Sequence, residues 1–152
     1  MPVEWTLPDD VIRLGGVGAQ KISTEDGTRQ QETARAILTS LKEQPGVILA
    51  DEVGMGKTYV ALAVVASVLN STRGSGRPVI VMVPPGLASK WPRDWKQFRS
   101  LCVSKQNALN WVEPAFARSP ADFFKMIDDP RGKRPHLIWI TTSCFHMGLN
   151  DP

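Results

Sequence analysis

Four residues in the first half of the chain, Gly54, Gly56, Lys57 and Thr58, have the types and spacing that bind the phosphates of a nucleotide. Glycines allow backbone conformations and a close approach that a Cβ atom would prevent, so successive N–H groups can surround a phosphate. Lys57 is placed to reach the β- and γ-phosphates, which makes it the candidate catalytic residue. The Thr58 hydroxyl is placed to ligate Mg²⁺. These residues predict a nucleotide-phosphate site.

The segments on either side of these residues have the order strand, loop and helix. Val47–Ala50 is short, apolar and rich in β-branched residues, which predicts a strand. Val60–Leu69 is apolar but too long for a typical strand, so it predicts a helix. A helix that begins at the loop has its unpaired N–H groups and the positive end of its dipole next to the bound anion. This order is the context that a phosphate loop requires.

The loop departs from the general pattern Gly-x4-Gly-Lys-[Ser/Thr], because Asp51 stands at its first position. Residues 49–58, Leu-Ala-Asp-Glu-Val-Gly-Met-Gly-Lys-Thr, resemble the first helicase motif of the Swi/Snf-type ATPases of helicase superfamily two. That motif typically reads Leu-Ala-Asp-Glu-Met-Gly-Leu-Gly-Lys-Thr. The resemblance implies a RecA-like ATP hydrolase domain with ATP and Mg²⁺ as ligands, and it adds Asp51 and Met55 to the ATP-binding residues. Bacterial members exist, so remodelling of nucleosomes does not follow.

Thr28–Gln44 is predicted to be a helix, since apolar residues recur at helical spacing and Pro45 and Gly46 follow. Two interpretations of Gln31 remain open. Thr28 could cap the helix with Gln31 as its capping-box partner. In the family that the loop resembles, a glutamine at the start of this helix recognises adenine, and Gln31 resembles it, with Gln30 as an alternative in a shifted register.

Val79–Val83 contains five apolar residues without alternation, which predicts a strand buried on both faces. The spacing from Val47–Ala50 through the helix to this strand predicts a right-handed βαβ unit with parallel strands. The fold class that follows is α/β, with a mainly parallel sheet flanked by helices and the site at the carboxyl ends of the strands.

Two further segments resemble nucleic-acid contacts of the same family. Val81–Phe98 is similar to the motif Val-Val-Pro-x-Ser-Leu-x-x-x-Trp-x-x-Glu-Phe, which touches the DNA backbone, and this implies phosphate contacts by Ser89 and Lys90. The aromatic residues of that segment have helical spacing and are predicted to pack in the core, namely Trp91, Trp95 and Phe98. The predicted strand Leu137–Thr142 resembles Leu-Val-Ile-Thr-Thr-Tyr, whose threonines face nucleic acid. Thr141 and Thr142 match it, although threonine is also simply a good strand residue.

Charge is distributed unevenly along the chain. Residues 1–70 contain 6 Lys and Arg against 9 Asp and Glu, whereas residues 71–152 contain 12 against 6. A basic second half suggests a polyanion partner, and a solvated basic face explains it equally well. The resemblance implies that this partner is double-stranded DNA.

The 152 residues fit one domain, and 42% apolar content is enough for a packed core. We expect an irregular lead-in over residues 1–28 and the N-terminal part of a RecA-like ATP-binding domain over residues 29–152. A Walker B run of apolar residues followed by Asp-Glu does not occur after Lys57, so the second RecA-like lobe is expected downstream. With no secretory signal or apolar span, we expect a cytoplasmic protein, nucleoid-associated in a bacterium or nuclear in a eukaryote.

The sequence therefore predicts the ATP-binding portion of a Swi/Snf-like DNA-dependent ATPase and translocase that cannot hydrolyse ATP alone. Two other classes remain open. The chain could be a small stand-alone P-loop kinase, which would complete its site within one chain. It could also be a non-catalytic module that only binds nucleotide or DNA.

Overall fold

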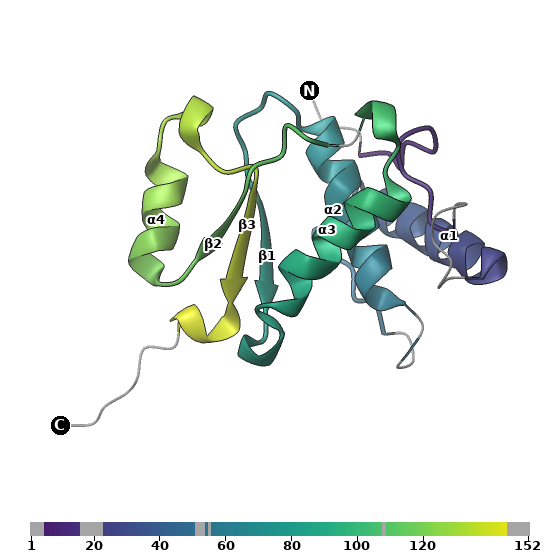
Figure 1. The fold of residues 1–152 in the computed structure, drawn as a ribbon, viewed down its shortest axis with the longest axis horizontal. Helices are drawn as coiled ribbons and strands as arrows, with labels where there is room; N and C mark the ends of the chain where they lie inside the picture. The colour runs from purple at the N-terminus through teal and green to yellow at the C-terminus, as the bar shows by residue number, and fades with distance from the viewer. Residues whose placement is uncertain (1–4, 16–22, 51–53, 55, 108, 146–152) are drawn as a thin grey trace. The chain divides into compact units, whose positions relative to one another are not determined.

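The computed structural model describes residues 5–15, 23–50, 54, 56–107 and 109–145 (Figure 1). The chain folds into two compact units. The first comprises Met1–Arg73 with Asp94–Asn110, and the second comprises Gly74–Arg93 with Trp111–Pro152. Among the described residues, no helix is both long and apolar enough to span a membrane.

The first unit begins with helix α1, Thr24–Ser40. Ser23 caps this helix, and its Oγ accepts a hydrogen bond of 3.0 Å from the Asp26 amide. The predicted helix therefore exists, but the predicted start at Thr28 is wrong. The hydroxyl of Thr28 lies inside the helix and donates to the Thr24 carbonyl at 2.9 Å. Serine is a better N-cap residue than threonine, and the Ser23 hydroxyl also donates to Asp26 Oδ2 at 2.8 Å, so the helix starts earlier.

Helix α2, Lys57–Ser71, forms as predicted from its apolar run, and it packs against α1. Both helices carry small and branched apolar side chains that are almost completely buried. These residues are Ala34, Leu38, Val60, Leu62, Ala63, Ala66 and Leu69. The buried Ser67 hydroxyl donates to the Ala63 carbonyl at 2.7 Å, so this polar group is satisfied inside the helix.

Helix α3, Lys90–Cys102, supplies the aromatic part of the first unit's core. Trp95 and Phe98 are 1% and 0% exposed, and their rings stack with centroids 6.0 Å apart. Tyr59 of α2 meets Phe98 edge to face at 5.9 Å. The core role predicted for Trp95 and Phe98 is confirmed. The lead-in residue Ile12 forms an isolated antiparallel bridge with Val103, directly after the helix.

The second unit is built on a parallel sheet of three strands, β1 (Val79–Val83), β2 (Pro114–Ala117) and β3 (Leu137–Thr141). Their spatial order is β1-β3-β2, and both pairs are parallel. Helix α4, Pro120–Asp128, agrees with the short helix that the sequence predicts over residues 121–127. The described residues also form short 3₁₀ turns. These turns are η1 (Pro85–Leu87), η2 (Lys105–Asn107), η3 (Arg131–Lys133) and η4 (Thr142–Phe145).

The central strand β3 is buried on both faces, in keeping with its run of apolar residues. Ile138 and Ile140 form a cluster with Ala117, and Phe123 and Met126 of α4 pack against it. On the opposite face, Trp139 is 2% exposed, and its ring lies 6.5 Å from that of Trp91. The fold is thus α/β, a small parallel sheet flanked by helices, and it is consistent with part of a RecA-like domain.

Strand β1 was predicted to be buried on both faces, and this is wrong. Ile80 and Met82 are 44% and 52% exposed, although Val83 is buried. The reason is the position of β1 at the edge of the sheet. The side chains on one face of this edge strand are not covered by the described residues, and apolar composition alone cannot supply that cover.

The strand predicted over Val47–Ala50 is not formed, and Ile48 is 92% exposed. The predicted βαβ unit with β1 is therefore wrong, since β1 pairs with β3 instead. A strand requires hydrogen bonds to a neighbour, which four apolar residues do not provide by themselves. Strand β2 was missed because Pro114 interrupts its pattern. Proline is tolerated there because it is the first residue of an edge strand.

Candidate nucleotide-phosphate site

The N-terminus of α2 is the centre of the candidate site. Gly56 is the N-cap, with φ 76° and ψ 27° in the left-handed region, and none of the described side chains caps the helix. The first turn closes with hydrogen bonds from the amides of Tyr59 and Val60 to the Gly56 carbonyl, at 3.0 and 3.2 Å. A helix start of this kind combines amide donors with the positive end of the dipole, so it favours an anion.

Two glycines with left-handed backbones precede Lys57 and Thr58. Gly54 has φ 87°, and a Cβ atom added there would meet no atom of the described residues within 4 Å. As far as the described residues go, the space beside Gly54 is therefore open. Glycine is needed at both positions because other residues rarely adopt this conformation. The remaining predicted loop residues, Asp51 and Met55, lie outside the described residues.

Gln30 of α1 lies against Gly56. Its side chain is only 5% exposed, and a Cβ atom on Gly56 would come within 2.9 Å of the Gln30 Cδ atom. The Gln30 Oε1 atom is buried and has no hydrogen-bond partner among the described residues. The structure therefore brings to the loop the glutamine that the sequence offered only as the alternative to Gln31.

Gln31 has a different environment, because both ends of its amide are hydrogen-bonded to the lead-in. The Leu14 amide donates to Oε1 at 2.9 Å, while Nε2 donates to Asp9 Oδ1 at 3.0 Å and to the Ile12 carbonyl at 2.9 Å. Asp9 also forms an ion pair with Arg35 at 2.7 Å. The interpretation of Gln31 as a capping-box partner is wrong. Its predicted role in ATP binding stays a prediction, and a nucleotide contact would have to replace these bonds.

The first turn of α2 is packed against α3 through Tyr59. Burial raises the pKa of the Tyr59 hydroxyl, and the negative charges that Cys102 and Asp94 can carry raise it further. Burial also raises the pKa of the Cys102 thiol to about 11. Both groups are therefore neutral at physiological pH. This packing holds the start of α2 through apolar contacts rather than through charge.

The predicted DNA-binding residues Ser89, Lys90, Thr141 and Thr142 all belong to the second unit. In the register of the parallel pair β1 and β3, Val83 lies opposite Thr141. The two strands consequently end at the same edge of the sheet (Figure 1). The segments that carry the four residues leave from that edge. Ser89 and Thr142 are exposed, and the Thr141 hydroxyl lies 3.1 Å from that of Ser143.

The architecture defines an α/β protein that is consistent with part of a RecA-like domain, with a glycine-bearing turn before an apolar helix. The sequence profile of the SNF2-related domain matches residues 29–142, and the chain belongs to this family. The predicted membership of the Swi/Snf-type ATPases is thereby confirmed.

Curated relatives support the same assignment. The RNA polymerase-associated protein RapA of Pseudomonas fluorescens (strain SBW25) is 41% identical over 107 residues. The RapA protein of Pseudomonas savastanoi pv. phaseolicola is 36% identical over 107 residues. Each alignment covers 70% of this chain and 10% of the relative, so the chain spans about a tenth of the length of the relatives it matches. No solved structure matches the chain.

Proposed function

We propose that the chain is the ATP-binding portion of a Swi/Snf-like, DNA-dependent ATPase that translocates on double-stranded DNA. The observation that carries the proposal is the pair of left-handed glycines, Gly54 and Gly56, directly before an α2 helix that begins with Lys57 and Thr58. Backbone amides at such a turn bind phosphate oxygens, and family membership makes ATP the expected nucleotide.

The described residues fit a bound Mg·ATP in two respects. The open space beside Gly54 and the uncapped start of α2 leave room for a phosphate group. Lys57 would neutralise charge on the β- and γ-phosphates, and the Thr58 hydroxyl would be one of the oxygen ligands of Mg²⁺. Magnesium in such sites takes few protein ligands besides phosphate oxygens and water, so one hydroxyl is a suitable contribution. The metal supplies charge neutralisation on the phosphates when bound.

Hydrolysis requires further groups that the sheet does not supply. A carboxylate at the end of a strand normally holds Mg²⁺ and positions the attacking water. Here β1 is followed by Pro84, β2 by Arg118 and β3 by Thr142. In our proposal another part of a longer protein provides the carboxylates and the arginine finger. The isolated chain binds ATP without turning it over.

In the second unit, Ser89, Lys90, Thr141 and Thr142 would contact DNA phosphates at the edge where β1 and β3 end. Such contacts position a protein on the duplex without reading its sequence. Because the relatives are named as RNA polymerase-associated proteins, we place this ATPase in the cytoplasm at the transcribed nucleoid. The DNA part of the proposal predicts binding that is independent of sequence and sensitive to salt.

The test is an assay of phosphate release and phosphate transfer by the purified chain, with and without duplex DNA. We expect no turnover from the wild-type chain. Turnover near 1 s⁻¹, which is within the usual range of enzymes, would contradict the proposal if Lys57→Ala abolished it. That result would favour the small P-loop kinase, because a kinase completes its site within one chain. The Lys57→Ala variant also controls for a contaminating ATPase.

A further inference from the structure

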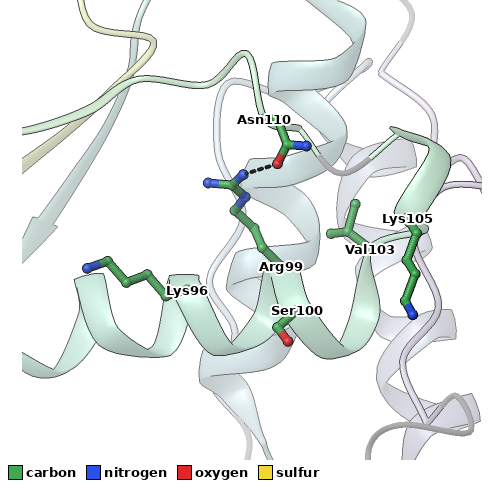
Figure 2. Close-up of a pocket in the computed structure, with 6 residues that line it drawn as sticks. All are labelled: Lys96, Arg99, Ser100, Val103, Lys105 and Asn110. Carbon is green, nitrogen blue, oxygen red and sulfur yellow. Dashed lines mark hydrogen bonds between the residues drawn. The ribbon is translucent and has the colours of Figure 1, made fainter.

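The first unit has a pocket of about 360 Å³ at the C-terminal end of α3 (Figure 2). None of the described residues that line it belongs to the nucleotide loop or to the predicted DNA contacts. Three of the six described lining residues are cationic. The residues that line it are Lys96, Arg99, Ser100, Val103, Lys105 and Asn110.

Helical spacing and a tertiary contact bring these side chains together. Lys96, Arg99 and Val103 follow one another at intervals of three and four residues, so they lie on one face of the helical segment. The Arg99 Nη2 atom donates to Asn110 Oδ1 at 2.8 Å, which orients the guanidinium group. Figure 2 shows Lys96 on one side of Arg99 and Lys105 on the other. The pocket therefore has an oriented guanidinium between two lysines.

No acidic side chain is among the described residues that line this pocket. Residues 90–110 contain five Lys and Arg but a single acidic residue, Asp94. Asp94 acts on Tyr59, whose pKa it raises, and it does not line the pocket. The lining of the pocket is thus suited to an anion.

We infer that this pocket, the basic α3 pocket, binds phosphates of a nucleic-acid backbone as a second contact surface. An arginine fork matches the geometry of a phosphate, and lysines add point charges beside it. Among the described lining residues, Val103, 6% exposed, is the one apolar residue, and none is aromatic. Protein partners usually require aromatic or apolar anchors in a desolvated centre, so the chemistry favours phosphate over an acidic protein.

The choice of nucleic acid as the phosphate source rests on the proposed function, whereas the anion site itself rests on the pocket. Lys96 and Lys105 are exposed and accessible to a ligand. Each phosphate that a cation neutralises on a DNA duplex changes the slope of log affinity against log salt by about 0.9. Three contacts therefore account for a change in slope of roughly 2–3.

The experiment measures binding of the 152-residue chain to a fluorescent DNA duplex and to a single-stranded RNA at several salt concentrations. The pocket variant is Lys96→Gln, Arg99→Gln, Lys105→Gln. The control is Lys42→Gln, Arg118→Gln, Lys125→Gln, which removes the same number of positive charges from exposed sites. We expect the pocket variant to lose roughly 2–3 units of salt slope and the control less than about one. Circular dichroism checks folding, and binding of Mg·ATP should be unchanged in both.

Equal losses in the two triple variants would overturn the inference, since net charge alone would explain them. If unlabelled poly-glutamate bound the wild type as tightly as nucleic acid and required the same residues, an acidic protein would replace nucleic acid as the partner. Competition by millimolar inorganic phosphate at constant ionic strength would identify a free-phosphate site and would also contradict the backbone contact.

The results of these binding measurements distinguish a failure of this inference from a failure of the proposed function. DNA binding that persists unchanged in the pocket variant contradicts the pocket alone. A wild-type chain that binds neither DNA nor RNA contradicts both the pocket and the DNA part of the proposed function, while binding of ATP tests the nucleotide site independently. If the triple variant fails to fold, Lys96→Gln and Lys105→Gln are measured singly, each with an expected loss of about 0.9 in slope. Unchanged slopes in both would overturn the inference.

Discussion

The side chain of Gln30 lies against Gly56, the N-cap residue of helix α2. The Gln30 Cδ atom would be 2.9 Å from a Cβ atom on Gly56, and Gln30 is buried with no partner for its Oε1 atom. Two features therefore require a glycine at position 56: the left-handed φ of 76° and the close approach of the Gln30 side chain. A residue of α1 thus helps to fix the start of α2.

Gly56→Ala should destabilise the chain more than Gly54→Ala. Both substitutions put alanine into the left-handed region, which costs about 1–2 kcal/mol. Only the substitution at Gly56 also drives a methyl group into Gln30, and overpacking adds about 1–3 kcal/mol. Urea denaturation followed by circular dichroism gives the two free energies of unfolding. The double variant Gly56→Ala, Gln30→Ala should cost less than the sum of the single variants, and strict additivity would contradict the contact.

Gln30 and Gln31 should respond differently to replacement by methionine. Gln30→Met removes a buried oxygen without a partner, so the free energy of unfolding should stay the same or rise. Gln31→Met removes three hydrogen bonds to the lead-in and should cost about 1–3 kcal/mol. Thermal and urea unfolding of the two variants provide the comparison. The opposite order of stabilities would show that the two side chains are wrongly assigned.

The stability of the first unit should fall at high pH because of Cys102. Burial raises the pKa of this thiol from 9.0 to about 11, so the folded state holds the proton more tightly than the unfolded state. The stabilisation is complete below pH 9 and is lost as the pH rises towards 11, by roughly 2–3 kcal/mol. Cys102→Ala should start from a lower stability but lose less over this range. Equal losses in the two proteins, measured by urea unfolding at pH 8 to 11, would contradict the assignment.

Elements with a strong local pattern could be predicted from the sequence. The apolar run of α2, the apolar strand Val79–Val83 and the short helix Pro120–Asp128 have the positions that periodicity indicated. Val47–Ala50 has a similar composition and forms no strand. The difference is the partner: β1 has β3 beside it, and the identity of a neighbouring strand is a tertiary property that a short apolar run does not encode.

In the candidate site, too, some features could be predicted from the local sequence and others depend on tertiary packing. The left-handed backbones of Gly54 and Gly56 follow from residue type and spacing, because few other residues adopt that conformation. The choice between Gln30 and Gln31 cannot be made from residue type and spacing. Neighbouring residues of a helix point about 100° apart, and only packing determines which of them meets the loop. The basic α3 pocket was also missed. Its charges resemble a solvated face in the sequence, and the partner Asn110 is brought to Arg99 by tertiary structure.

The most direct test of the central claim is a calorimetric titration of the chain with Mg·ATP, compared between wild type, Lys57→Ala and Lys42→Ala. Lys42 is an exposed lysine outside the loop, so its replacement controls for the loss of one positive charge. A charge-assisted contact contributes about 1.5–3 kcal/mol, so Lys57→Ala should weaken binding roughly ten- to a hundredfold. Lys42→Ala should bind as the wild type does. Equal affinities of wild type and Lys57→Ala would contradict a nucleotide-phosphate site at the start of α2.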